Sequence, residues 1–204
     1  MSSQTQTAGI ILAAGASVRF GQLKQLIKLR GKYLVEWVLD AALKSRLDIV
    51  VLVLGHENQS ILQALGTKAR HPQLAVVINH RYREGQSSSL KAGLKSVRQA
   101  FSSVMYLLGD QPMINSNTIN HLLGQFRETE KDICVPVFEG KRGNPTVFKR
   151  PIYEELMMID GDIGARDIIG KGADRVLYAK IKDPLCFFDI DSQDDLQNLM
   201  TLLP

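Results

Sequence analysis

The first apolar run of the chain constrains the fold more than any other segment. Residues 8–14 read Ala-Gly-Ile-Ile-Leu-Ala-Ala, and the run ends at Gly15. A strand that is apolar on both faces is typical of a parallel sheet covered by helices, whereas a strand with one wet face alternates apolar and polar residues. The run therefore predicts a buried parallel strand and requires crossover helices elsewhere in the chain.

Further strands and helices alternate along the rest of the sequence. Leu34, Val38 and Ala42 recur at i, i+4 spacing, which predicts an amphipathic helix over 33–45. Ser192 and Asp195 resemble a capping box that opens the last helix, and Pro151 is placed to open a short one. Strands are predicted over 49–54, 74–78, 103–108, 132–138, 146–148, 176–181 and 186–190, and further helices over 59–65, from 87 and around 119–126. This order predicts one domain over residues 1–204, a Rossmann-like three-layer α/β/α sandwich with a mainly parallel sheet.

Composition narrows the class of protein. Hydrophobic residues make up 45% and charged residues 23% of 204 residues, which is typical of a globular protein. The net charge of +4 is dispersed, so we expect no nucleic-acid partner. Two cysteines outside any CxxC motif favour a reducing compartment, and the first apolar run is too short for a signal core or a membrane span. We therefore expect a cytoplasmic protein without a membrane partner.

The loop after the first predicted strand, residues 12–24, has the features of an anion site. Gly15 permits a tight turn there, and Arg19 and Lys24 add positive charge. The loop matches neither GxGxxG nor the P-loop pattern, so known fingerprints do not identify its ligand. The combination is suited to a triphosphate, and the plainer alternative is a glycine turn with two solvated basic side chains.

Carboxylates follow two other predicted strands. Asp110 comes directly after the strand over 103–108, and Asp189 and Asp191 share one face of the predicted strand 186–190 as it ends. Because ligands of open α/β sheets bind beyond the carboxyl ends of the strands, Asp110 is a natural Mg²⁺ ligand there. One of the two later aspartates would complete the metal site, although turn formation at Asp110 and helix capping at Asp191 are simpler roles.

A polar loop follows the strand over 74–78 and runs into the next helix. Asn79, Gly85 and Ser89 lie in it, and polar groups at this edge of the sheet are suited to the edge of a nucleobase. Taken alone, the serines of this loop are more typical of a simple helix cap.

Together, these loops resemble the MobA-like nucleotidyltransferase family, and most closely its molybdenum cofactor cytidylyltransferase branch. The resemblance covers nearly the whole chain. The motifs that carry it, in order, are Leu-Ala-Ala-Gly-Ala-Ser-Val-Arg-Phe-Gly-Gln-Leu-Lys at 12–24, Asn79, Gly-Gln-Ser-Ser-Ser-Leu at 85–90, Leu-Gly-Asp-Gln-Pro at 108–112, Gly-Lys-Arg-Gly-Asn-Pro at 140–145, Gly-Asp-Ile-Gly-Ala-Arg at 161–166 and Asp-Ile-Asp-Ser at 189–192.

The resemblance implies a nucleotide-diphospho-sugar transferase type of fold and a defined reaction. CMP would move from CTP to the phosphate of a molybdopterin-type molybdenum cofactor, with release of pyrophosphate. Arg19, Lys24 and Asp110 would be the catalytic residues, and Asp110 with Asp191, or otherwise Asp189, would hold Mg²⁺. The product would pass to a recipient enzyme such as a molybdenum hydroxylase.

The same resemblance assigns the binding residues. The nucleotide would contact residues of the first loop and of the polar loop, namely Leu12, Ala13, Ala14, Gly15, Arg19, Lys24, Asn79, Gly85 and Ser89. The acceptor would contact Arg142, Gly143, Asn144, Pro145 and Arg166. Guanylyl-transferring relatives usually have Gly-Gly where this chain has Ala14-Gly15, which favours CTP. Asn144 replaces the His of many cytidylyl members, so the exact acceptor stays open.

Several alternatives remain at this point. A GTP-dependent guanylyltransferase, or transfer to another phosphorylated acceptor, shares the fold and the mechanism. A sugar-phosphate or methylerythritol-phosphate cytidylyltransferase shares the first loop, but the stretch from Gly161 to Arg166 argues against it. A non-catalytic carrier of the cofactor would have lost phosphate-binding or metal-binding residues, whereas Arg19, Lys24 and Asp110 are present.

Overall fold

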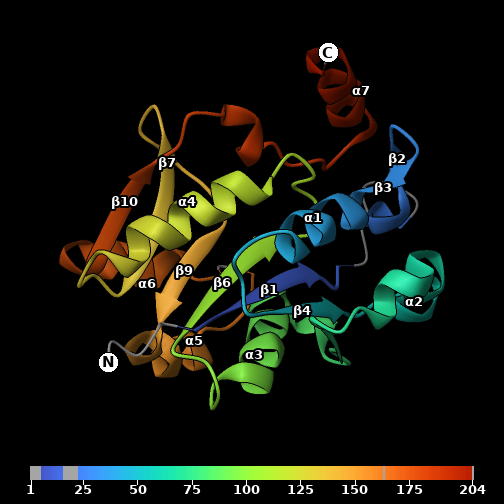
Figure 1. The fold of residues 1–204 in the computed structure, drawn as a ribbon. Helices are drawn as coiled ribbons and strands as arrows, with labels where there is room; N and C mark the ends of the chain where they lie inside the picture. The colour runs from blue at the N-terminus through green and yellow to red at the C-terminus, as the bar shows by residue number, and fades with distance from the viewer. Residues whose placement is uncertain (1–5, 16–22, 163, 204) are drawn as a thin grey trace.

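A computed structural model describes residues 6–15, 23–162 and 164–203 of the chain. Its centre is an eight-stranded sheet with the order β10-β7-β9-β6-β1-β4-β5, in which β8 pairs with β7 (Figure 1). The strands are β1 (Thr7–Ala13), β4 (Ile49–Leu54), β5 (Leu74–Ile78), β6 (Ser103–Leu108), β7 (Ile133–Phe138), β8 (Lys141–Arg142), β9 (Thr146–Lys149) and β10 (Val176–Lys180).

The first apolar run forms a central strand, as predicted. β1 lies between β4 and β6 and is parallel to both, with Ile10 paired to Val51 on one side and to Tyr106 on the other. The side chains of Ile10 and Ile11 are fully buried on opposite faces of the sheet. The pairs β1–β4, β1–β6, β4–β5 and β7–β10 are parallel, which confirms the prediction of a mainly parallel sheet. The sheet is nevertheless mixed, because β9 runs antiparallel to β6 and to β7.

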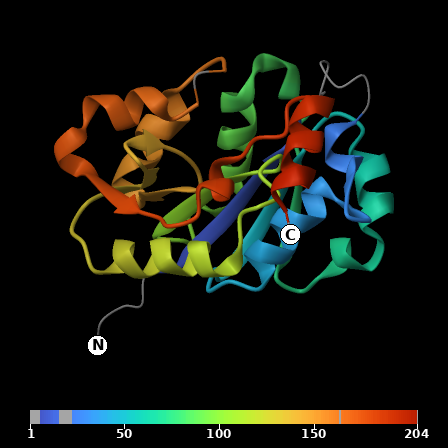
Figure 2. The ribbon, with the colours of Figure 1, turned by 90° about the horizontal axis from the view of Figure 1, so that it is seen from above.

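Helices cover both faces of the sheet. The helices are α1 (Leu34–Leu43), α2 (Asn58–Leu65), α3 (Gln86–Val97), α4 (Ser116–Arg127), α5 (Tyr153–Met158), α6 (Arg166–Lys171) and α7 (Gln193–Leu202). One apolar cluster joins the sheet to α1, α2 and α4, and a second joins its other face to α3, α5 and α6. Figures 1 and 2 show this arrangement from two sides, and it confirms the predicted three-layer sandwich.

The apolar spacing and the caps explain the helices. Val35, Val38 and Leu39 of α1 are fully buried, and the helix starts where Glu36 Oε2 accepts a hydrogen bond of 3.0 Å from the Tyr33 amide. At the start of α7, Ser192 Oγ accepts from the Asp195 amide at 3.1 Å, which confirms the predicted cap. Pro151 is the second residue of a 3-10 helix over Arg150–Ile152 that leads into α5, so the predicted short helix exists and begins one residue earlier than predicted.

The prediction of a strand over 186–190 is wrong. A 3-10 helix over Pro184–Phe187 stands there instead, and residues 188–192 follow without regular structure. Pro184 lies at the start of this helix, where its missing N–H costs nothing, and Asp183 Oδ1 accepts from the Leu185 amide at 3.0 Å. Local capping therefore outweighed the β propensity of the apolar residues.

The strands of a small hairpin were not predicted, and neither was helix α6. A hairpin of β2 (Lys28–Leu29) and β3 (Lys32–Tyr33) follows the 3-10 helix over Lys24–Leu26, and it forms a separate two-stranded sheet. A third apolar cluster joins this region to α7 through Ile27 and Leu199. The C-terminal helix is thereby packed beside the segment that carries Lys24. In the part of the chain that the structure describes, no helix combines the length and the apolarity needed to cross a bilayer.

Candidate active site

Lys24 bridges two aspartates at the carboxyl edge of the sheet. Its Nζ lies 2.8 Å from Asp110 Oδ2 and 2.7 Å from Asp191 Oδ1. Lys24 stands in the 3-10 helix after the first loop, Asp110 follows β6, and Asp191 precedes α7. The structure therefore brings together three residues that the sequence analysis had placed in three separate motifs.

Backbone pairing and apolar packing explain this convergence. The Ile190 amide donates to the Asp110 carbonyl oxygen at 3.1 Å, so the backbone before Asp191 is attached directly to the loop after β6. Ile190 is fully buried in the same apolar cluster as Ile27, which lies three residues after Lys24. The ion pairs thus lie between two segments that the core holds in place.

Charge and burial at Lys24 act in opposite directions. Burial disfavours the ammonium form, but the carboxylates of Asp110 and Asp191 outweigh it and hold the pKa of Lys24 above its ordinary value. Lys24 is therefore a cation at every pH near neutrality. The other oxygen of Asp110, Oδ1, is buried and has no hydrogen-bond partner among the described residues. A buried carboxylate oxygen in this state is costly unless a ligand satisfies it.

Asp189 and Asp191 have different surroundings. Asp189 Oδ1 accepts a hydrogen bond of 2.9 Å from Gln111 Nε2, whereas Asp191 contacts Lys24. Desolvation and the charge of Asp110 raise the pKa of Asp189. The predicted shared face of a strand does not exist here, because these residues follow a 3-10 helix. Among the described residues, no group of three or more His, Cys, Asp or Glu side chains forms a metal centre.

The stem of the first loop is tightly held. Ala13 and Ala14 are buried, and Gly15 is exposed. The Ala14 carbonyl oxygen accepts from the His56 amide at 3.3 Å, and the side chain of Ala14 packs in the core. Arg19 lies outside the described residues. The methyl group of Ala14 therefore contributes to packing, and any contact with a ligand at this position falls to its backbone.

Asn79 and Ser89 form part of a closed hydrogen-bond network. Asn79 Nδ2 donates to Ser88 Oγ at 2.8 Å and to Ser89 Oγ at 2.9 Å, and Asn79 Oδ1 accepts from the Arg81 amide at 3.0 Å. Both amide hydrogens of Asn79 are used by serines in the first turn of α3. The network shapes the loop, and the role of these residues in base recognition stays a prediction.

Gly85 joins this loop to the segment that contains Gly161 and Asp162. Its φ of 96° and ψ of 174° lie in a region that only glycine adopts readily. A Cβ at Gly85 would lie 2.6 Å from the Gly161 carbonyl carbon and 2.7 Å from Asp162 Oδ1. Asp162 Oδ1 accepts from the Gln86 amide at 2.9 Å. The start of α3 is therefore capped by the segment that precedes Arg166.

Four of the five predicted acceptor residues line one pocket. The pocket has a volume of about 320 Å³ and includes Arg142, Gly143, Asn144 and Arg166. Apolar walls come from the sheet and from two helices, through Leu12, Leu90, Leu108, Val135, Phe148 and Ile169. Pro145 is not in the lining. Leu12 belongs to the predicted nucleotide segment, so the two predicted regions adjoin.

Close packing also defines the rim of this pocket. A Cβ at Gly143 would lie 2.3 Å from ring carbons of Phe187, so the ring and the backbone meet without room for a side chain. The Arg142 guanidinium lies 5.1 Å from the centre of the Tyr178 ring, a cation–π contact. Arg142 is therefore held at the rim from outside the pocket.

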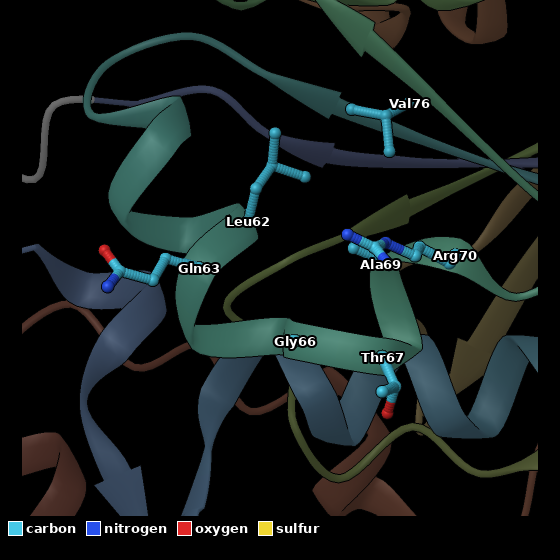
Figure 3. Close-up of a pocket in the computed structure, with 7 residues that line it drawn as sticks. All are labelled: Leu62, Gln63, Gly66, Thr67, Ala69, Arg70 and Val76. Atoms are coloured by element: carbon cyan, nitrogen blue, oxygen red, sulfur yellow. The ribbon is translucent and has the colours of Figure 1, made fainter.

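A second pocket lies away from these residues. It has a volume of about 590 Å³ between α2, the 3-10 helix Gly66–Arg70 and β5 (Figure 3). Leu62, Ala69 and Val76 contribute apolar surface, and Arg70 is its charged residue. It contains none of the predicted site residues.

Three residues of the site were not predicted. Gln25 donates to the first loop, Gln111 donates to Asp189, and Asp162 caps α3. Gln25 and Gln111 each directly follow a residue that was predicted, and Asp162 lies in one of the motifs. Their positions beside or within the motifs indicate that they lie near the site, but only the folded structure shows which atoms they bind.

The family model for the MobA-like NTP transferase domain matches residues 9–176. Purine catabolism protein PucB of Bacillus subtilis is 30% identical over 196 residues, which covers 92% of this chain and 94% of that protein. A probable molybdenum cofactor guanylyltransferase of Thermococcus sibiricus is 27% identical over 202 residues, covering 94% and 96%.

Solved structures agree with this relationship. The crystal structure of Rv0371c from Mycobacterium tuberculosis has a TM-score of 0.84 and 26% identity, covering 98% of this chain and 99% of that chain. A structure of the same protein in complex with manganese has a TM-score of 0.78. The matched motifs, the fold and the length of the alignments lead to one conclusion: the chain belongs to the MobA-like NTP transferase family.

Proposed function

We propose that this protein transfers CMP from CTP to the phosphate of a molybdopterin-type molybdenum cofactor. In this reaction an acceptor phosphate oxygen forms a bond to the α-phosphorus of CTP, the bond between the α-phosphorus and its bridging oxygen to the β-phosphorus breaks, and pyrophosphate leaves. The observation that carries the proposal is the position of Lys24 between Asp110 and Asp191. Family membership supports the same class of reaction.

Lys24 would stabilise the leaving group. Its ammonium stays charged at neutral pH, because the two carboxylates outweigh the burial that would otherwise lower its pKa. Transfer of a nucleotidyl group places additional negative charge on the pyrophosphate as the bond breaks, and a fixed cation favours that state over the ground state. Arg19 would add a second cation on the basis of its place in the first-loop motif.

Asp110 and Asp191 suit a divalent metal ion such as Mg²⁺. The buried Asp110 Oδ1, which has no hydrogen-bond partner among the described residues, and the carboxylate of Asp191 on the other side of Lys24 fit a site that accepts positive charge. A bound metal ion would neutralise phosphate charge and align the triphosphate. The manganese complex of Rv0371c is consistent with this choice.

The pocket with Arg142 and Arg166 suits a ring system that carries a phosphate. Arginine recognises phosphate through parallel hydrogen bonds, the apolar walls fit a flat ring, and Asn144 adds an amide that can both donate and accept. The pterin of the molybdenum cofactor has this combination of groups. Leu12 at the edge of the pocket would bring the acceptor beside the nucleotide.

CTP is favoured over GTP by the Ala13-Ala14-Gly15 form of the first loop, and GTP remains the alternative that the Thermococcus relative supports. A carrier without catalytic activity would not require Lys24 and Asp110 in contact. The cytidylylated product would then serve a recipient enzyme such as a molybdenum hydroxylase, in the cytoplasm.

The deciding experiment measures pyrophosphate release with Mg²⁺ and molybdenum-loaded molybdopterin, with CTP, GTP and ATP tested separately. Acceptor-dependent release with CTP is the expected result. Preference for GTP would move the protein to the guanylyl branch. No release with any of the three nucleotides, from a protein shown to be folded, would overturn the proposed activity.

A further inference from the structure

Gln25 connects the two sides of the first loop. Gln25 is 6% exposed, and its Nε2 donates to the carbonyl oxygens of Ala13 and Gly15, each at 3.1 Å. Ala13 and Gly15 precede the segment 16–22, and Gln25 follows it. One amide group therefore holds together the chain that enters the loop and the chain that leaves it.

These hydrogen bonds also orient the peptide groups at the stem. A carbonyl oxygen carries partial negative charge, which would repel a phosphate that faced it. Because a trans peptide is planar, the Ala14 N–H lies on the side opposite to the Ala13 oxygen. With that oxygen directed to Gln25, the Ala14 N–H is directed away from Gln25. At the stem, the carbonyl oxygens of Ala13 and Gly15 are therefore occupied by Gln25, and the Ala14 N–H points to the opposite side.

The same residue fixes the backbone of Lys24. Lys24 and Gln25 are neighbours in the 3-10 helix Lys24–Leu26, and Lys24 Nζ bridges Asp110 and Asp191. The turn is thus attached to β1 through Gln25 and to the two aspartates through Lys24. A shift of the Gln25 side chain would move the Lys24 backbone relative to the end of β1.

We propose that Gln25 is a positioning residue for the nucleoside triphosphate, which it never contacts itself. It holds the carbonyl oxygens of Ala13 and Gly15 and the backbone of Lys24 in the arrangement that binds the triphosphate. This inference rests on the proposed function, because it assumes that the first loop binds CTP.

The test compares Gln25→Met with Gln73→Met. Methionine is close to glutamine in length and shape but has no amide donors. Gln73 is a matched control, because its Nε2 also donates to a backbone carbonyl oxygen, that of Leu47, just before β5 and away from the carboxyl edge. CTP binding is measured by titration calorimetry on the full chain with Mg²⁺ and without acceptor, and thermal unfolding is measured in parallel.

Both variants are expected to lower the melting temperature, since Gln25→Met removes the donor to two carbonyl oxygens and Gln73→Met the donor to one. Only Gln25→Met is expected to weaken CTP binding, by about tenfold, and to raise the KM for CTP while the KM for the acceptor stays within about twofold. Gln25→Asn retains the donors on a shorter side chain, and is expected to fold and to bind CTP with intermediate affinity.

Three results would count against the inference. CTP affinity equal to wild type in folded Gln25→Met, or in Gln25→Asn if the first variant does not fold, would overturn it. An equal loss in Gln73→Met would also overturn it, because general destabilisation would then explain the effect. If the wild-type protein itself binds no nucleoside triphosphate, both the proposed function and this inference fail. If the wild-type protein binds CTP and only the comparison of variants fails, the inference about Gln25 is wrong and the proposed function stands.

Discussion

Lys24 Nζ lies 2.8 Å from Asp110 Oδ2, although 85 residues lie between Lys24 and Asp110 in the chain. Asp110 has one oxygen in this ion pair and its other oxygen buried without a partner among the described residues. The pair therefore combines a fixed cation with a carboxylate that can still accept a ligand.

The first prediction concerns catalysis by this pair. Lys24→Ala and Asp110→Ala are each expected to lower turnover by roughly 10²–10³-fold, the usual effect of removing a group that stabilises charge in the transition state. Circular dichroism checks the fold, and pyrophosphate release measures the rate.

Lys68→Ala is the matched control, because Lys68 also bridges two carboxylates, at 2.9 Å from Glu36 and 3.2 Å from Asp40, on α1. Its turnover should match wild type. Near-normal turnover in a folded Lys24→Ala protein would remove Lys24 from the mechanism.

The second prediction concerns the choice of base. Replacing Ala14 with Gly is expected to reduce the preference for CTP over GTP. The methyl group of Ala14 is buried, so the substitution acts by making the backbone at this position more flexible. Glycine in place of alanine makes an ordered backbone less stable by roughly 0.5–1 kcal/mol. The ratio of kcat/KM values for CTP and GTP checks this, and an unchanged ratio would show that position 14 does not select the base.

The third prediction concerns the acceptor pocket. Arg166→Gln is expected to raise the KM for the acceptor by about tenfold or more, because a charged hydrogen bond to phosphate contributes roughly 1.5–3 kcal/mol. The KM for CTP should not change. Lys171→Gln is the control on the same helix, since Lys171 does not line this pocket. Equal acceptor KM values in both variants would contradict the assignment of Arg166.

The fourth prediction concerns Gly85. Gly85→Ala is expected to destabilise the protein by roughly 1–3 kcal/mol, because an alanine is strained at this backbone conformation and its Cβ would overlap the segment at Gly161. Gly124→Ala, in the interior of α4 with nothing within 4 Å of its Cβ, should instead stabilise by about 0.5–1 kcal/mol. Urea denaturation measures both, and a Gly85→Ala protein as stable as wild type would contradict the packing described.

The fifth prediction concerns pH. Burial disfavours the charged form of Asp40, but Lys32 and Lys68 outweigh it and hold its pKa below the ordinary value of 3.8. A lowered pKa contributes stability above the unfolded-state value and loses it as the pH falls through the folded-state value. Asp40→Asn should therefore cost about 1 kcal/mol at pH 7, and the difference from wild type should shrink below pH 3.8.

Urea denaturation at several pH values tests this loss. Glu84→Gln is the control, since Glu84 pairs with Arg81 on the surface and its removal should leave stability unchanged. A difference between Asp40→Asn and wild type that stayed constant down to pH 2 would argue against Asp40 as its source.

Most of the secondary structure could be predicted from local patterns in the amino-acid sequence. Runs such as 8–14 and the i, i+4 spacing of Leu34, Val38 and Ala42 are local patterns, and burial follows directly from them. The wrong prediction also has a local cause. The predicted strand over 186–190 is a 3-10 helix followed by an irregular segment, because Pro184 and the cap by Asp183 favour a helical turn more strongly than the apolar residues favour a strand.

Which residues contact one another in the site depends on packing between distant segments. The sequence pattern does not distinguish Asp189 from Asp191 as a metal ligand, yet in the structure Asp189 is bound by Gln111 and Asp191 by Lys24. That difference depends on the Ile190 amide bound to the Asp110 carbonyl oxygen and on the apolar cluster beneath α7. Secondary structure follows from neighbours along the chain, whereas the partners of a side chain follow from packing between distant segments, which no local pattern encodes.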